Sequence, residues 1–298
     1  MNTTSSRTAS RLSSHLTAAL AALALSAVAT GCAYDAQAPL DEEVAAKDEE
    51  ITNAPADGPL FVVNLGNCSG VAISANYILT SAHCFNNSSF FAVTVRAGLF
   101  SESVAFSGTA QVVVHPSWSA SASDRDAWDI AVVRLFGAGL GTGFERARIY
   151  AGPETPWTTR GNGFYVAGYG QGTGSGGARN CSSADAGGII KRGGNFAFLG
   201  SGRKSGSTWL SVNGYSSLRT TCNGDSGAPY ILPRNGVDFA FAIHSGSTNT
   251  AGGTMRATMI TPKMSWIQAT AASMGVPLVC PLVRDHRTSP AMHYFDCR

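Results

Sequence analysis

Gly224-Asp225-Ser226-Gly227-Ala228-Pro229 constrains the architecture of this 298-residue chain more than any other segment. Two shorter strings precede it, Thr80-Ser81-Ala82-His83-Cys84 and Asp129-Ile130-Ala131-Val132-Val133. Their histidine and aspartate and the later serine follow one another at separations of 46 and 97 residues. A serine hydroxyl becomes a strong nucleophile when a histidine removes its proton and a carboxylate orients that histidine. The three strings contain the residue types that such a site needs, and any one of them alone could be coincidence.

In this order and at this spacing, the strings resemble the chymotrypsin-like (trypsin-fold) serine endopeptidases over about residues 51–275. The resemblance implies an all-β fold of two six-stranded antiparallel β-barrels with a C-terminal helix, and an enzyme that hydrolyses peptide bonds. It makes Ser226 the nucleophile, His83 the general base and then acid, and Asp129 the buried carboxylate that fixes the imidazole tautomer. The backbone N–H groups of Gly224 and Ser226 would form the oxyanion hole, since glycine tolerates positive φ and close approach of a substrate.

Two other aspartates compete with Asp129 for the triad role. Asp124 and Asp126 lie in a polar segment just ahead of it. Only Asp129 directly precedes an apolar run, Ile130-Ala131-Val132-Val133, where a carboxylate would be buried and directional. The sequence therefore favours Asp129.

The rest of the chain has the pattern of short strands. Charged residues make up only 13%, glycines number 34, and Ser, Thr and Gly separate short apolar runs, which is typical of all-β chains. A first set of strands is expected over 61–65, 70–74, 77–80, 92–97, 108–115 and 130–135. A second set is expected over 163–168, 195–199, 208–212, 229–232, 239–244 and 254–258. Helical spacing of apolar residues predicts a helix over 262–273.

The N-terminus has the pattern of a secretory signal. Arg7 and Arg11 precede an apolar run over 16–30 that is too short to span a bilayer. The run ends at Ala29-Thr30-Gly31-Cys32, which resembles a bacterial lipobox whose cysteine is acylated; the alternative is an ordinary signal peptide cut nearby, for example after Ala33. The sequence predicts an extracytoplasmic protein, either secreted or attached to a bacterial membrane through lipidated Cys32.

Four segments follow from these observations. Residues 1–32 are the expected signal peptide, and residues 33–50, with seven acids against one lysine, are an acidic propeptide or tether. Residues 51–275 form the expected protease domain. Residues 276–298 are a C-terminal extension with Cys280 and Cys297, for which the sequence offers no function.

Seven cysteines are an odd number, and setting Cys32 aside leaves six, enough for three bridges in an oxidising compartment. In the family, one bridge closes the loop that holds the catalytic histidine. Another joins the cysteine shortly before the nucleophile to the loop after the next strand, but that loop (247–254) has no cysteine here, so Cys181 is the best candidate partner for Cys222. The expected pairs are Cys68–Cys84, Cys181–Cys222 and Cys280–Cys297.

Asp225 has a separate role in the family. There, this aspartate pairs with the α-ammonium created when a propeptide is cut before an Ile-Val-Gly-Gly-type start, and the pair orders the oxyanion loop. The matching start here is Ile51-Thr52-Asn53-Ala54, which keeps the isoleucine and replaces both glycines. Ile51 and Asp225 are thus the expected activation pair of a zymogen; the alternative is a single-chain enzyme that needs no cut.

The substrate pocket departs from that of trypsin. The family position whose aspartate selects Lys or Arg substrates is Thr220 here, and the usual Ser-Trp-Gly edge is replaced by His244-Ser245-Gly246. His244 together with Thr221 is similar to the glutamyl endopeptidases, in which two such residues hydrogen-bond a substrate carboxylate. The alternative is that His244 only caps the triad aspartate or faces solvent, and that the pocket takes small or apolar side chains.

Charge and spacing limit the other partners. Residues 51–298 carry 18 Lys+Arg against 12 Asp+Glu without a basic run, so no nucleic-acid partner is expected. No metal-ligand spacing is evident, no cofactor is expected, and the protein is expected to be a monomer that acts on proteins or peptides. The rival interpretation is a non-catalytic protease homologue that serves as a binding or adhesion module, but such homologues usually lose a triad member.

Overall fold

The computed structural model describes residues 58–298 of the chain. It leaves out 86, 88, 99–102, 123–124, 142–143, 153–163, 171–190, 195–196, 205–206, 214–220, 248–253 and 287–290. Within the strands of residues 191–213, side chains are described only for 209–211.

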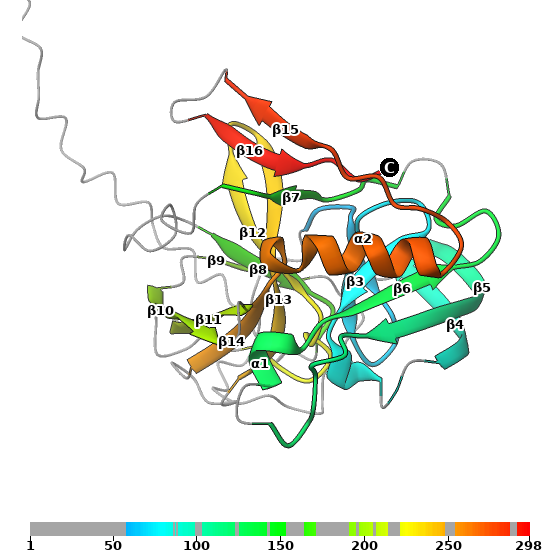
Figure 1. The fold of residues 1–298 in the computed structure, drawn as a ribbon, viewed down its shortest axis with the longest axis horizontal. Helices are drawn as coiled ribbons and strands as arrows, with labels where there is room; N and C mark the ends of the chain where they lie inside the picture. The colour runs from blue at the N-terminus through cyan, green and yellow to red at the C-terminus, as the bar shows by residue number, and fades with distance from the viewer. Residues whose placement is uncertain are drawn as a thin grey trace, which may run out of the picture. The chain divides into compact units, whose positions relative to one another are not determined.

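The first half of the described chain is a closed antiparallel barrel of six strands in the order β1-β2-β3-β6-β5-β4 (Figure 1). Its strands are β1 (Val62–Asn64), β2 (Ser69–Ala72), β3 (Tyr77–Thr80), β4 (Ser89–Ala97), β5 (Ser103–Val114) and β6 (Ala131–Leu135). Strand β4 buries Val93, Val95 and Ala97 and exposes the residues between them, as expected when alternate side chains face a barrel interior. The predicted first barrel is confirmed.

The second half is a sheet of ten strands, with the path β10-β11-β14-β13-β12-β8-β9. Its strands are β7 (Arg148–Tyr150), β8 (Tyr165–Gly168), β9 (Lys191–Gly194), β10 (Ala197–Lys204), β11 (Ser207–Asn213), β12 (Pro229–Arg234), β13 (Val237–Ser247), β14 (Thr254–Met259), β15 (Leu282–Asp285) and β16 (Met292–Phe295). Six of them match the predicted second set, so the chymotrypsin-like fold is confirmed. The sheet is larger than predicted because β7, β9, β15 and β16 also join it.

The C-terminal extension is part of the folded domain. Strands β15 and β16 form a hairpin, and β16 pairs with β7, which in turn runs parallel to β13 (Figure 1). A disulfide joins Cys280 and Cys297 on either side of the hairpin. Leu278, Cys280 and Cys297 are buried in the central hydrophobic cluster. The extension therefore contributes to the core.

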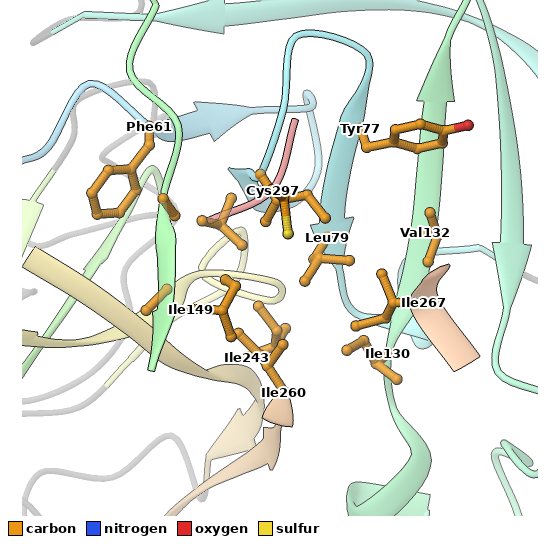
Figure 2. Packing of buried hydrophobic residues seen from close by; sticks show 14 of the residues in the cluster. Phe61, Tyr77, Leu79, Ile130, Val132, Ile149, Ile243, Ile260, Ile267 and Cys297 are labelled. Carbon is orange, nitrogen blue, oxygen red and sulfur yellow. The ribbon is translucent and has the colours of Figure 1, made fainter. Parts of the chain in front are cut away.

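The central cluster joins the two halves. It combines barrel residues such as Leu79 and Val132 with Ile149 and Ile243 of the second sheet (Figure 2). Helix α2 (Met264–Ser273), which confirms the predicted C-terminal helix, adds Ile267. Hydrophobic packing in this cluster fixes the two halves against each other, and the site described below lies where they meet.

Tyr77 fastens the end of α2 to the barrel. Its buried hydroxyl lies 3.0 Å from the carbonyl oxygen of Ala271, in the last turn of the helix, and 2.5 Å from that of Val276, just after the helix, so its one proton is shared between these two acceptors. Carbonyl groups at the C-terminal end of a helix lack partners within the helix, so an outside donor such as Tyr77 stabilises this end.

In the described residues, no helix has the length and apolar content needed to cross a membrane.

Candidate active site

His83, Asp129 and Ser226 come together between the two halves. His83 lies in a 3₁₀ turn (Ala82–Cys84) that follows β3, and Asp129 lies between α1 (Arg125–Trp128) and β6. His83 Nδ1 is 2.6 Å from Asp129 Oδ2, and His83 Nε2 is 2.7 Å from Ser226 Oγ. Distances of this kind are those of strong hydrogen bonds. The structure therefore brings the three residues nominated by the sequence into one continuous chain of contacts.

Asp129 is held by more than the imidazole. Its carboxylate is buried, and Oδ1 accepts a hydrogen bond from the backbone N–H of His83 at 2.8 Å. The Ser245 hydroxyl donates to Oδ2 at 2.6 Å, and the Thr258 hydroxyl donates to the Asp129 carbonyl oxygen at 3.2 Å. Donors from two halves of the fold thus orient one carboxylate. Sequence reasoning did not assign this contact to Ser245, although its position beside His244 in β13 was a usable signal.

The loop that carries Ser226 is tied to the first barrel by Ser69. The Ser69 N–H donates to the Ser226 carbonyl oxygen at 2.8 Å, and the Ser69 hydroxyl donates to the Gly224 carbonyl oxygen at 2.8 Å. The Thr80 hydroxyl in turn donates to the Ser69 carbonyl oxygen at 2.7 Å. Ser69 is fully buried, so these contacts are shielded from water. They fix the backbone on both sides of Asp225.

Two N–H groups of this loop remain available. The N–H groups of Asp225, Gly227 and Ala228 donate to carbonyl oxygens, whereas those of Gly224 and Ser226 donate to no group in the part of the chain that the structure describes. Gly224 has φ +97°, a conformation that side chains with a Cβ disfavour. Gly224, one of the two predicted oxyanion donors, thus has the positive φ for which glycine was expected at this position.

Asp225 is fully buried beneath the loop. Its Oδ1 accepts the N–H of Gly170 and its Oδ2 accepts the N–H of Cys222, each at 2.9 Å. A Cβ at Gly170 would overlap the Asp225 carboxyl group, so glycine is required there. Ile51, the predicted partner of Asp225, lies outside the described residues.

Disulfides flank the site. Cys68 and Cys84 are bonded, which closes the loop around His83 and contributes about 3 kcal/mol in a chain-entropy account. Cys222 is also disulfide-bonded. Its predicted partner Cys181 lies outside the described residues, as does Cys32.

A cavity of about 290 Å³ opens onto the triad. His83, Asp129 and Ser226 line it together with His244 and Gly246, as the pocket prediction requires. Thr221 is fully buried and is not among the lining residues, and Thr220 lies outside the described residues. The cavity also includes Trp118 and Arg125, which sequence reasoning missed because both lie in the polar segment before Asp129.

His244 is a neutral donor beside the nucleophile. Burial, with a smaller effect of nearby His83, lowers the pKa of His244 to about 3. Its Nδ1 is 3.2 Å from the hydroxyl of Tyr230, whose pKa is raised by burial and by Asp225. Tyr230 therefore stays protonated, and its hydroxyl can either donate to Nδ1 or accept from it; if it donates, the imidazole proton lies on Nε2. The backbone of His244 is fixed as well, because the Ser81 hydroxyl donates to its carbonyl oxygen at 2.5 Å.

Aromatic and basic side chains hold α1 in place. The His115 ring lies between those of Trp128 and Trp266, with both centroid distances 4.6 Å. Burial, and secondarily Lys263, lowers the pKa of His115 to about 4. Lys263 is itself buried, with Nζ 5.0 Å from the Trp128 ring centroid, and burial lowers its pKa to about 8. Trp128, which directly precedes Asp129, is therefore fixed by a cation–π contact and by stacking.

The buried His115 predicts acid-dependent stability. An unfolded histidine titrates near pH 6.5, so between pH 6.5 and about 4 the unfolded chain binds more protons than the native state. Above pH 6.5 His115 should not lower the free energy of unfolding. As the pH falls from 6.5 to about 4, the free energy of unfolding should decrease by about 3 kcal/mol because of this one residue. Urea unfolding at pH 7, 5.5 and 4 measures the loss. His115→Phe should reduce the pH dependence and the exposed-site control His286→Gln should not; equal slopes for all three proteins would contradict the assignment.

Two comparisons with known proteins bear on the family and the fold. Residues 49–267 match the family model of the trypsins. Among solved structures, the chain is similar to mouse neuropsin, a serine protease expressed in the limbic system of the brain, with a TM-score of 0.53 and 20% sequence identity. The match covers 72% of this chain and 96% of that one, and at this identity it establishes the shared fold.

Proposed function

Because the chain belongs to the trypsin family of serine endopeptidases, we propose that it hydrolyses peptide bonds with Ser226, His83 and Asp129. The observation that carries the assignment is the hydrogen-bonded chain from Ser226 Oγ through the imidazole to Asp129, at 2.7 and 2.6 Å. A fluorophosphonate probe, which reacts with activated serines, tests the nucleophile directly. Ser226 should be labelled in the wild type, and Ser226→Ala should remain unlabelled.

The proposed reaction has two halves. Ser226 Oγ attacks the carbonyl carbon of the scissile bond while its proton moves to His83 Nε2, and Asp129 stabilises the imidazolium through Nδ1. When the C–N bond breaks, His83 returns that proton to the leaving amine. A water molecule then attacks the acyl-enzyme with His83 as base, which releases the acid and restores Ser226.

The oxyanion of each tetrahedral intermediate would be bound by the N–H groups of Gly224 and Ser226. Support comes from their lack of other acceptors in the described residues and from the contacts of Ser69 and Asp225, which hold the loop before substrate arrives. Donors that are positioned in advance stabilise developing charge without reorganisation.

We propose that the residue on the acyl side of the scissile bond carries a carboxylate. Trypsin-like basic specificity is not expected, since Thr220 stands where the family's pocket aspartate would be. His244 lines the cavity, and with Tyr230 donating to Nδ1 the Nε2–H of His244 would be the donor toward a ligand. A hydrogen bond from such a donor to a substrate carboxylate contributes about 1.5–3 kcal/mol. Because Thr221 is fully buried and does not line the cavity, the proposal depends on His244.

Matched peptides that differ only at that position test the preference. Wild type should cleave the Glu peptide about 10–100 times faster, in kcat/KM, than the Gln peptide, because only the carboxylate forms the charge-assisted bond. His244→Ala should bring this ratio near one. Tyr230→Phe should reduce it without abolishing cleavage, because the tautomer of His244 is no longer fixed.

Two results would contradict the acidic preference while leaving the protease assignment intact. One is a wild-type preference for Phe, Leu or Ala on the acyl side. The other is that His244→Ala slows cleavage of all peptides by the same factor. The exposed-histidine variant His286→Gln is the matched control.

The disulfides support an extracytoplasmic location, because such bonds form and persist in oxidising compartments. We further propose a signal peptide that ends at Cys32, lipidation of that cysteine, and action as a monomer. The acidic segment 33–50 would then be a propeptide between the anchor and the domain, and Ile51 would pair with Asp225 after a cut behind Glu50. Glu50 has the side chain expected of a substrate, so one molecule could process another.

A further inference from the structure

Arg125 places a positive charge in the cavity that contains the triad. It is the first residue of α1 and lines the same cavity of about 290 Å³ as Ser226, His83 and His244. Its side chain is 55% exposed, so the guanidinium can meet a ligand without prior rearrangement of the core. Neither the triad nor the His244 proposal uses it.

The charges around Arg125 leave it weakly engaged. Its Nε lies 3.6 Å from Asp126 Oδ1, but the other oxygen of that carboxylate is closer to Arg256 Nη1, at 2.9 Å. The Ser245 hydroxyl also donates to Asp126, at 3.1 Å. Asp126 is therefore already neutralised by Arg256. The second carboxylate nearby, Asp129, is buried and bonded to His83. Among the lining residues that the structure describes, Arg125 is consequently the permanently charged one that is open to solvent.

The backbone next to Arg125 is held by hydrogen bonds and packing, whereas its side chain is largely exposed. The Thr258 hydroxyl donates to the Asp126 carbonyl oxygen at 2.6 Å, and Trp128 packs against His115 and Lys263. An exposed guanidinium on a backbone held in this way suits recognition of a planar carboxylate, which can accept two parallel N–H donors.

We propose that Arg125 binds a second substrate carboxylate, on the acyl side of the scissile bond, so that the enzyme prefers peptides with consecutive acidic residues. The proposal rests on the endopeptidase function given above. The acyl side is chosen because the chain's own junction has this form: Asp48-Glu49-Glu50 precedes Ile51, and the four residues 51–54 carry no charge. A second copy of the chain would thus present one carboxylate to His244 and another to Arg125.

Peptides spanning residues 45–54 test the assignment, namely the parent, a Glu49→Gln peptide, an Asp48→Asn peptide and the doubly neutralised peptide. In wild type, kcat/KM should fall about fivefold on neutralising the acid that Arg125 contacts, the upper end for a solvent-exposed ion pair. The difference should shrink as salt is added. Arg125→Gln should bring the ratio near one, and Arg125→Glu should favour a lysine at the same peptide position.

Arg146→Gln is the matched control. Arg146 is 47% exposed and pairs with Asp296 at 3.4 Å, much as Arg125 pairs with Asp126, but it lines a different cavity. This variant should keep the wild-type ratios. If Arg125→Gln also keeps the wild-type kcat/KM ratios, Arg125 does not bind a substrate carboxylate and the proposal is overturned.

Two further measurements separate this proposal from the others. If a Glu50→Gln peptide is cleaved as fast as the parent while the Arg125-dependent ratio persists, the His244 preference fails and the Arg125 assignment stands. If no peptide is turned over, binding of the fluorescent parent peptide to Ser226→Ala is compared with binding to Ser226→Ala/Arg125→Gln. An affinity about fivefold weaker in the double variant supports the proposal, and equal affinities overturn it.

Discussion

Ser226→Ala and His83→Ala are each expected to lower kcat by up to about 10⁶-fold while the protein stays folded. Ser226→Ala removes the attacking oxygen, and His83→Ala removes the base at Nε2 that would take the proton of Ser226 Oγ. Kinetics on one peptide substrate and circular dichroism measure activity and folding together. Ser107→Ala, at an exposed serine of β5, is the control and should retain wild-type activity.

Asp129→Asn should cost about 10⁴-fold, since an amide cannot fix the imidazole in the required tautomer. Asp126→Asn is a close control: both carboxylates lie within hydrogen-bond distance of the Ser245 hydroxyl, at 3.1 Å for Asp126 and 2.6 Å for Asp129, but only Asp129 contacts His83. The Asp126 variant should lose less than about tenfold. Similar losses in the two variants would mean that the carboxylate acts through packing of α1, and would remove Asp129 from the triad.

A cut between Glu50 and Ile51 is expected to raise kcat/KM by about 10²–10³-fold. Asp225 is fully buried, and its carboxylate accepts hydrogen bonds from the backbone N–H groups of Gly170 and Cys222. An ammonium at Ile51 would form a buried ion pair with this carboxylate, and breaking such a pair costs about 3–5 kcal/mol. The measurement compares the full chain, blocked at the junction by Glu50→Gln, with a chain that begins at Ile51.

Two controls sharpen the activation test. Acetylating the new terminus keeps the cut but removes the ammonium, so activity should return to the uncut level. Asp225→Asn should have the same effect on the cut form, because the partner charge is lost. A blocked full-length chain with full activity would instead establish a single-chain enzyme, in which the N–H groups of Gly170 and Cys222 are sufficient for Asp225.

Local patterns were enough for the fold and for the residues nominated as the triad. The alternation in β4 predicts a strand with one face toward the barrel interior. The continuous apolar run after Asp129 predicts a strand that is buried on both faces, by the barrel interior and by the layer packed outside it. The same run distinguishes Asp129 from Asp126. In the structure Asp126 contacts Arg256 and Ser245, more than a hundred residues away, and nothing in its local sequence indicates those partners.

The unpredicted elements have few residues or long-range partners. Strand β7 has three residues, too few for any periodicity, and it exists because β13 and β16 pair with it. Strand β16 pairs mainly with β15 in a hairpin closed by the Cys280–Cys297 bridge. Arg125 is part of the site because it lines the cavity, and Tyr230 because its hydroxyl contacts His244; both relations arise only from the tertiary structure. Contacts of this kind cannot be predicted from local sequence patterns, because they depend on how the strands are arranged in space.

The pairing of β16 with β7 has a consequence for association between molecules. Without it, β7 would offer unpaired N–H and C=O groups on one side, a template on which another chain could add a strand and begin to aggregate. The strand that becomes outermost instead is β15, which is only four residues long and carries Arg284 and Asp285. Short, charged outer strands resist such addition. The last residues of the chain thus close off a surface through which a concentrated protease could precipitate.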